Sequence, residues 1–166
     1  MSSPRLRTDV ADAYIFRRPW GELELLQLRR TADPDAAGKD VIAGTWQPVM
    51  GHIDEGETAP RAVAREVEEE TGLKLSDALG FWALEQVHPY YLVTRDAIML
   101  SPRFAVEAAK DWEPVLNDEH DAHRWVRATD AERLFMWPGQ RAAIAEILRL
   151  LAPGSLEEPA LRLPRG

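Results

Sequence analysis

The chain contains no cysteine among its 166 residues. It therefore has no disulfide framework and no thiolate metal site, which is typical of proteins in a reducing compartment. No stretch approaches the roughly 20 apolar residues that a membrane-spanning helix needs. The first ten residues, MSSPRLRTDV, lack the apolar run of a signal peptide. We therefore expect a cytoplasmic protein without a membrane partner.

Basic residues are the scarcer charged class, with 20 Lys and Arg against 28 Asp and Glu and a formal net charge of −8. A chain with this balance has no long-range attraction for a nucleic-acid backbone, so we expect no nucleic-acid partner. A small polyanionic substrate would have to be met by a local basic cluster or by bound cations.

Short apolar stretches separated by turn residues predict several strands. Residues 10–18 and 22–30 flank Pro19-Trp20-Gly21 and read as a hairpin. Further strands are expected within residues 45–50, 73–87, 98–106 and 122–126. In the third of these, Pro102 indicates an edge strand or a bulge. The Ala-, Asp- and Gly-rich segment 31–44 predicts a loop.

Two segments predict helices. Residues 58–71 have a possible cap in Thr58, a proline in the first turn and Gly72 to end the helix. Residues 141–151 are amphipathic. Because strands precede, separate and follow these helices, we expect a mixed α/β (α+β) fold with helices covering the sheet. We expect one domain over residues 1–152 and, from three prolines, a loosely ordered tail over 153–166.

Acidic side chains gather in GHIDEGETAPRAVAREVEEETGL, residues 51–73. On the expected helix, Glu66, Glu69 and Glu70 are spaced i, i+3 and i+4 and share one face. Stacked like charges destabilise a helix by about 0.2–0.5 kcal/mol per pair. A divalent cation would neutralise them, since Mg²⁺ takes carboxylate oxygens and keeps positions for water and phosphate. The alternative is a solvated acidic face, the usual role of a charge run.

The spacing within this segment resembles the Nudix box at every defined position. The matching residues are Gly51, Glu57, Arg65, Glu66, Val67, Glu69, Glu70, Gly72 and Leu73. The resemblance implies a Nudix fold, with a mixed β-sheet sandwiched between α-helices. It also implies hydrolysis of a diphosphate linkage in a nucleotide-like small molecule, with Mg²⁺ or Mn²⁺ as cofactor.

The resemblance also assigns roles to the polar residues of the box. Glu66, Glu69 and Glu70 are the implied metal ligands, with the general base among them. Glu57 and Arg65 are implied to form an ion pair that fixes the loop against the helix. A backbone carbonyl near Gly51 is implied to complete the metal shell.

Segments outside the box extend the resemblance to one branch of the family, the dihydroneopterin triphosphate and nucleoside triphosphate pyrophosphohydrolases. EHDAHRWV at residues 119–126 and WPGQRAAI at 137–144 carry this part. In that branch an acidic residue beside a histidine, ahead of the last strand, adds a metal ligand or base. Glu119 matches it. The alternative for Glu119 is a polar loop.

Five further side chains are candidates for contact with the substrate. Arg29 and Arg30 end a strand where this branch contacts phosphates, and His52 follows the first glycine of the box. Trp46 and Tyr90 could stack on a base or pterin ring. The alternatives are solvated arginines, a surface histidine and aromatic residues of the core.

Clues from single residues disagree about the substrate. Pro89, 16 residues after Leu73, is typical of ADP-ribose hydrolases, whereas Tyr90 and Tyr91 are typical of diadenosine polyphosphate hydrolases. The longer similarity favours a nucleoside or pterin triphosphate, cleaved to the monophosphate and pyrophosphate. ADP-ribose, a dinucleoside polyphosphate and a catalytically silent nucleotide-binding module are the alternatives. Whether the chain forms a homodimer is left open.

Overall fold

The structure is a computed structural model, and it describes residues 3–31 and 43–165. The strands are β1 (Arg5–Arg7), β2 (Val10–Arg17), β3 (Glu24–Arg30), β4 (Trp46–Gln47), β5 (Val49–His52), β6 (Gly80–Ala83), β7 (Tyr90–Leu92), β8 (Ala97–Met99), β9 (Arg103–Glu107) and β10 (His120–Arg127). The helices are α1 (Ala59–Thr71), α2 (Ala131–Leu134), α3 (Pro138–Leu150) and α4 (Glu158–Leu161). The expected loop at 31–44 lies almost wholly outside the described residues.

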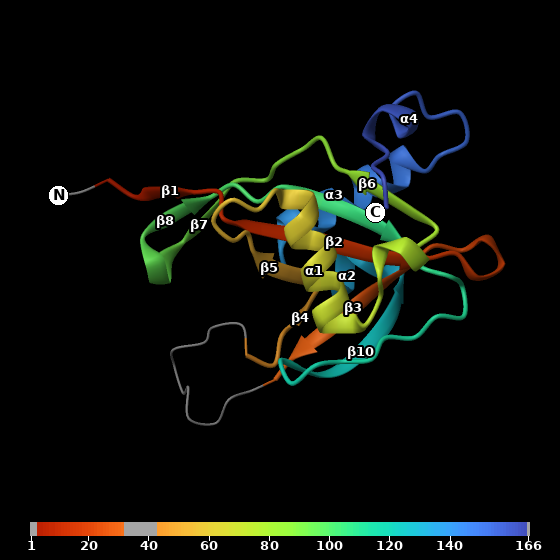
Figure 1. Cartoon of the computed structure of the whole chain (residues 1–166), viewed down its shortest axis with the longest axis horizontal. Helices are drawn as coiled ribbons and strands as arrows, with labels where there is room; N and C mark the ends of the chain where they lie inside the picture. The colour runs from red at the N-terminus through yellow and green to blue at the C-terminus, as the bar shows by residue number, and fades with distance from the viewer. Residues whose placement is uncertain (1–2, 32–42, 166) are drawn as a thin grey trace.

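The larger sheet is mixed and runs in the order β10-β3-β2-β9-β6. β2 and β9 are parallel, whereas the other neighbours in this order are antiparallel. The sheet splits at one end, where β4 pairs with β3 and β5 pairs with β2. A smaller sheet, β1-β8-β7, projects from it (Figure 1).

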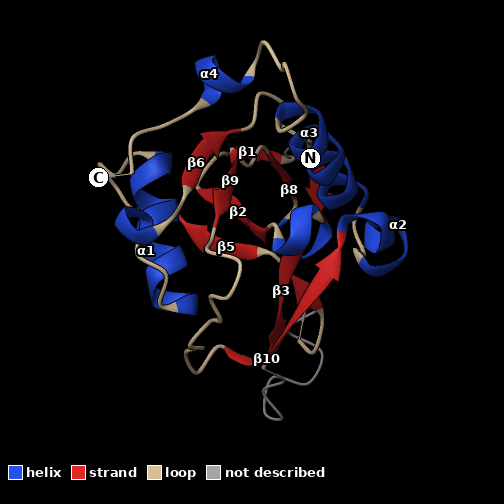
Figure 2. Cartoon of the chain, turned by 90° about the vertical axis from the view of Figure 1, so that its right-hand side faces the viewer, coloured by secondary structure: helices blue, strands red, loops and turns tan. Residues whose placement is uncertain are grey.

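Helices cover both faces of the larger sheet, with α1 on one side and α2 and α3 on the other (Figure 2). Alternate residues of β2 show why. Ala13 and Ile15 pack in the core that contains Val63 and Val67 of α1. Tyr14 and Phe16 pack with residues of α3 in a second core. This alternation confirms the expected α/β architecture.

Helix α1 begins and ends where the sequence predicts. Thr58 occupies the N-cap position with extended backbone angles, although its hydroxyl makes no capping hydrogen bond. Gly72 ends the helix with φ +73°, a left-handed conformation that glycine adopts without strain. Val63 and Val67 are 2% and 0% exposed, so the apolar stripe holds α1 against the sheet and orients its acidic face.

Two predicted strands are each divided by a proline. The segment 98–106 contributes to β8 and β9, which belong to different sheets, so the single strand was wrong. An edge position for it was also wrong, because β9 lies between β2 and β6. Pro102 lies where the chain passes from β8 in the smaller sheet to β9 in the larger one. It has no backbone N–H, but its carbonyl accepts a hydrogen bond from the backbone N–H of Asp12. Pro48 likewise separates β4 from β5.

The C-terminal segment, expected to be a loosely ordered tail, contains α4 and returns to the edge of β6. Leu163 donates a backbone hydrogen bond to the carbonyl of Phe81 at 2.8 Å, and Arg162 forms a β-bridge with Trp82. The edge strand β6 offers backbone hydrogen-bonding groups to this segment. The three prolines of the segment predict a loose tail because they give no sign of that pairing. Within the described part of the chain, no helix is long and apolar enough to cross a membrane.

Candidate active site

The loop after β5 and helix α1 bring the box residues together. Gly51 lies directly beneath the Glu66 side chain: a Cβ atom at Gly51 would lie 2.0 Å from Cδ and 2.3 Å from Oε1 of Glu66. Contacts this short are not tolerated, so only glycine leaves room for this carboxylate against β5. Glycine is therefore needed at position 51 for the close approach of the Glu66 side chain to β5.

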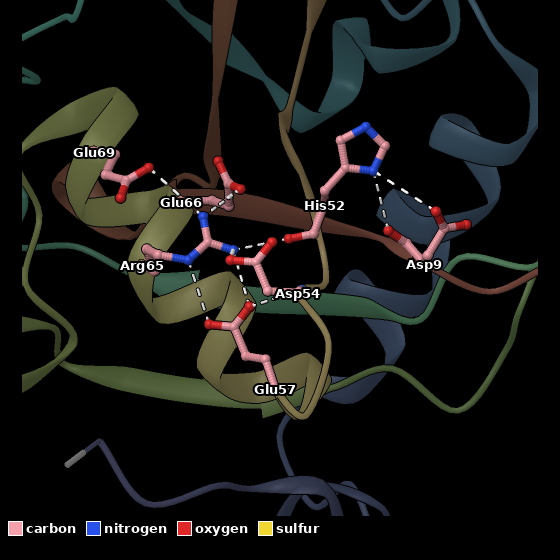
Figure 3. Close-up of polar contacts among 7 residues, drawn as sticks. All are labelled: Asp9, His52, Asp54, Glu57, Arg65, Glu66 and Glu69. Atoms are coloured by element: carbon pink, nitrogen blue, oxygen red, sulfur yellow. Dashed lines mark hydrogen bonds and ion pairs between the residues drawn. The ribbon is translucent and has the colours of Figure 1, made fainter.

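Arg65 joins the loop to the helix (Figure 3). Its guanidinium donates to Glu57 Oε2 at 2.9 Å and to the carbonyl of His52 at 2.8 Å. On the helix it donates to Glu66 Oε1 at 2.6 Å and lies 3.6 Å from Glu69 Oε2. The ion pair expected between Glu57 and Arg65 is thus present, and it is part of a larger network that orients Glu66.

Replacing Arg65 with lysine tests this network. Lysine keeps the positive charge. However, its single ammonium group lacks the planar, multiple N–H donors with which the guanidinium hydrogen-bonds both the loop and the helix. We expect the free energy of unfolding to fall by about 1–3 kcal/mol and turnover to fall on the order of tenfold or more, because Glu66 loses its orientation. Chemical denaturation and steady-state kinetics measure both. Arg133→Lys, in an exposed pair with Asp130, is the matched control; equal behaviour of the two variants would contradict the role of Arg65.

Glu70 is the most deeply buried of the box glutamates, at 3% exposure, whereas the Glu69 side chain is 56% exposed. Glu70 Oε2 has no hydrogen-bond partner within the described residues and lies 3.8 Å from Nε2 of His120. Burial, followed by the charges of Glu66 and Glu119, raises the pKa of Glu70 to about 9. This carboxylate needs a positive partner to be ionised at neutral pH.

His120 lies beside Glu70, although the sequence analysis did not select it. It is 4% exposed, and neither ring nitrogen has a hydrogen-bond partner in the described part of the chain. Burial, followed by the charge of the Arg30 guanidinium, lowers the pKa of His120 and so favours the neutral imidazole. Its position after Glu119 in the Glu-His pair was the available signal, but only the register of β10 against β3 brings it to Glu70.

Glu119 and Arg30 complete the rim of the acidic cluster. Arg30 Nη1 lies 3.1 Å from Glu119 Oε2. Glu119 is close enough to Glu66 and Glu70 to raise the pKa of both, and burial is the larger cause in each case. Four carboxyl groups, on Glu66, Glu69, Glu70 and Glu119, therefore repel one another around one end of α1.

The donor set fits a hard divalent cation. Within the described residues no three His, Asp or Glu side chains are already arranged around a metal position, and the Arg65 guanidinium contacts both Glu66 and Glu69. However, Glu70 Oε2 is buried without a hydrogen-bond partner among the described residues. The missing side chain of Gly51 also lets the Glu66 carboxylate lie against the β5 backbone. Oxygen-rich, mutually repelling ligands of this kind are those that Mg²⁺ and Mn²⁺ neutralise.

The expected substrate residues do not all lie at this cluster. Arg29 and Arg30 point to opposite faces of β3, and Arg29 pairs with Asp121 at 2.6 Å. The Trp46 ring lies under Arg124, 4.2 Å from its guanidinium carbon, rather than beside the glutamates. The His52 imidazole is turned toward Asp9, with Nδ1 3.9 Å from Asp9 Oδ2 (Figure 3). Of these residues, only Arg30 contacts a carboxylate of the acidic cluster.

Tyr90 lies against a second group of polar residues, on the sheet face opposite α1. Burial, followed by the charge of Asp12, raises its pKa. Asp12 faces Arg103 across the parallel pair β2–β9. Burial raises the pKa of Asp12 to about 7, although the Arg103 guanidinium opposes the shift. The sequence analysis did not select Asp12 or Arg103, because nothing local shows that they meet.

The buried carboxyl of Asp12 predicts a pH-dependent contribution to stability. Its pKa rises on folding from 3.8 to about 7, so the folded state binds more protons across this range and stability falls as pH rises through it. Asp12→Asn removes the titration. We expect the variant to gain stability relative to the parent as pH rises from about 4 to about 7, measured by urea unfolding. Asp130→Asn, an exposed control, should show no such gain; a constant difference between Asp12→Asn and the parent would contradict the assignment.

Comparison with known proteins identifies the family. The NUDIX domain family matches residues 6–147. The chain belongs to the Nudix family. It is a Nudix hydrolase, and enzymes of this family generally use divalent metal ions.

The individual proteins that this chain resembles share only a fifth to a third of its residues over the matched regions. A dihydroneopterin triphosphate diphosphatase of Escherichia coli is 27% identical over 75% of this chain and 82% of its own. An octanoyltransferase of Myxococcus xanthus is 34% identical over 61% of this chain, but the match spans only 28% of that protein. Among solved structures, an Ap4A hydrolase of C. elegans has a TM-score of 0.71 at 20% identity, covering 88% of this chain and 98% of that one. This last likeness shows the Nudix fold alone.

Proposed function

We propose that this Nudix hydrolase is a Mg²⁺- or Mn²⁺-dependent pyrophosphohydrolase that cleaves a nucleoside or pterin triphosphate to the monophosphate and pyrophosphate. The observation that carries the reaction class is the buried carboxyl of Glu70, whose Oε2 has no hydrogen-bond partner among the described residues, beside the Glu66 carboxylate that lies over Gly51. The similarity to the Escherichia coli diphosphatase over three quarters of this chain supports the substrate class.

The residues that would hold the cation are Glu66, Glu69, Glu70 and Glu119, together with a backbone carbonyl near Gly51. A bound divalent cation supplies charge neutralisation for the diphosphate and lowers the pKa of an attacking water molecule. Arg65 orients Glu66 and ties the loop to α1. Arg30, at the rim, adds positive charge next to Glu119, where the phosphate chain would enter.

A product-resolved hydrolysis screen tests this proposal. Purified protein is assayed with Mg²⁺ and with Mn²⁺ against nucleoside triphosphates, dihydroneopterin triphosphate, ADP-ribose, diadenosine polyphosphates and nucleotide sugars. We expect pyrophosphate and a monophosphate from one or more triphosphates. No cleavage of any substrate, with nucleotide nevertheless raising the melting temperature, would contradict the proposal and favour a silent binding module.

Dinucleoside polyphosphates are the second candidate class. A bis(5′-nucleosyl)-tetraphosphatase of Rattus norvegicus is 27% identical over 61% of this chain and 68% of its own. Asymmetric cleavage of diadenosine tetraphosphate, giving AMP and ATP faster than any triphosphate is cleaved, would select this class.

A further inference from the structure

His120 faces Glu70 from the start of β10, and both side chains are buried. The His120 side chain is 0% exposed and the Glu70 side chain 4% exposed. Nε2 of His120 and Oε2 of Glu70 are 3.8 Å apart, and neither atom has a hydrogen-bond partner among residues 3–31 and 43–165. Nδ1 of His120 is likewise buried without a partner in these ranges. Two polar groups that face each other are therefore both unsatisfied.

An irregularity in β10 turns His120 toward α1. His120 is opposite Arg30 of β3. Ala122, two residues further on, is opposite the adjacent Arg29, so one residue of β10 is extra at this β-bulge. Residues directly opposite each other in an antiparallel pair lie on the same face of the sheet. Regular alternation back from Ala122 would place His120 on the other face, so the bulge re-aims the imidazole toward the acidic end of α1.

Packing alone does not account for a histidine at this position. Buried side-chain nitrogens are nearly always hydrogen-bonded, and a phenyl ring would fill similar space without leaving two of them unsatisfied. Arg30, the register partner of His120, has only N–H donors on its side chain and cannot accept a hydrogen bond from the ring. The Glu70 carboxylate is an acceptor. At 3.8 Å it lacks only about 1 Å of approach, since N–H···O hydrogen bonds are about 2.7–3.2 Å long.

The Glu70 carboxylate is also held from β5, where the backbone of Met50 hydrogen-bonds it. A hydrogen bond from His120 would hold the same carboxylate from a second strand, β10. A carboxylate has about four acceptor positions, so these two bonds leave room for a cation. Histidine can donate from Nε2 in its neutral form as well as in its charged form, so the contact does not depend on the protonation state of the ring.

We infer that His120 is a positioning residue of the active site, which donates a hydrogen bond from Nε2 to Oε2 of Glu70 and so fixes this carboxylate for a divalent cation. The inference rests on the proposed function, because the cation belongs to that proposal. A bound cation keeps the carboxylate charged, and hydrogen bonds to a charged acceptor are shorter and roughly twice as strong as neutral ones. The gap between the two side chains therefore closes when Glu70 binds the cation. Hydrogen bonds of this kind, made to a metal ligand from behind, raise metal affinity.

Substitutions of His120 separate this role from packing. His120→Phe keeps a planar ring and removes both nitrogens. His120→Gln is the conservative variant, because the amide nitrogen of glutamine extends about as far from the backbone as histidine Nε2. His120→Asn carries the same amide one bond closer to the backbone. His123→Phe is the matched control, since His123 lies on the same strand and its Nε2 contacts Glu113 Oε2, outside the acidic cluster, at 3.1 Å.

Two measurements on the full chain decide between the roles: Mn²⁺ affinity, from the paramagnetic resonance signal of the free ion, and urea unfolding in EDTA. We expect His120→Phe to bind Mn²⁺ on the order of ten- to a hundredfold more weakly than the parent. Without metal it should unfold at an equal or higher urea concentration, because a buried unsatisfied group is gone. A residue that only packs would not weaken metal binding while preserving the metal-free fold. His120→Gln should recover most of the affinity and His120→Asn little of it, and His123→Phe should bind Mn²⁺ like the parent.

A double variant tests whether His120 acts through Glu70. In protein that already carries Glu70→Gln, His120→Phe should cause little further loss of Mn²⁺ affinity, because the two side chains act as one unit. A loss as large as in the parent background would overturn the inference. Nitrogen hyperfine coupling in the pulsed resonance spectrum of bound Mn²⁺ would also overturn it, since His120 would then be a metal ligand itself.

Failure of the inference and failure of the proposed function give different results. Parental Mn²⁺ affinity in His120→Phe would overturn the inference and leave the proposed function standing. If His120→Phe does not fold, equal affinities of His120→Gln and His120→Asn would overturn the inference in the same way. A parent protein that binds no Mn²⁺ would overturn both.

Discussion

Replacing Glu70 with glutamine is expected to reduce kcat/KM at least about a hundredfold, or roughly 3 kcal/mol of transition-state stabilisation. The substitution removes the charge of the most buried carboxylate at the acidic end of α1. Without that charge, a cation there would lose a negatively charged oxygen ligand. Steady-state kinetics on the substrate found by the hydrolysis screen measures the effect.

The same substitution should leave the metal-free fold intact. With its pKa raised to about 9, Glu70 is protonated at neutral pH when no cation is bound, and glutamine has nearly the same shape. We expect the free energy of unfolding in EDTA to change by less than about 1 kcal/mol. Glu68→Gln is the matched control, because Glu68 is an exposed glutamate on the same helix. Normal turnover by Glu70→Gln, or an equal loss in Glu68→Gln, would contradict the placement of the site.

Replacing Gly51 with alanine is expected to be comparably damaging to turnover, although it removes no functional group. The new methyl would occupy the space of the Glu66 carboxylate, 2.0 Å from its Cδ. Because that carboxylate is the mobile end of a long side chain, it will move aside rather than unfold the protein. We expect at least about a hundredfold loss of kcat/KM, since small misplacements of catalytic groups have effects of this size.

Gly21→Ala separates this effect from a general loss of stability. Gly21 has φ +85° in the turn between β2 and β3, with no atom within 4 Å of a new Cβ. It should cost on the order of 1 kcal/mol through backbone strain and leave turnover unchanged. Full activity of Gly51→Ala would show that catalysis does not depend on the position of the Glu66 carboxylate over β5, and would contradict the role assigned to Gly51.

The sequence predicts this protein best where the relevant contacts are local. Helix α1, its ends and the Glu57–Arg65 pair lie within one continuous segment, so spacing alone orders them. The hairpin of β2 and β3 is similarly local, and both are present in the structure. Pro102 misled the prediction because a proline in the chain marks either an edge or a crossing between sheets, and only the pairing of β9 decides.

The rest of the site depends on register between distant strands. His120 reaches Glu70 because β10 pairs with Arg30 of β3, and Asp12 faces Arg103 because β9 runs parallel to β2. A shift of one residue in either pairing would turn these side chains to the opposite face. Such register is set by packing over the whole sheet, which explains why Arg29 and Arg30, adjacent in sequence, contact different groups.

We propose that Glu66, Glu69, Glu70 and Glu119 hold a divalent cation. Titration of the protein with Mn²⁺, followed by the paramagnetic resonance signal of the free ion, tests it without reference to any substrate. We expect the parent protein and Glu68→Gln to bind Mn²⁺ alike, and Glu66→Gln and Glu70→Gln to bind it at least about tenfold more weakly. Equal Mn²⁺ affinity in all four proteins would contradict the claim.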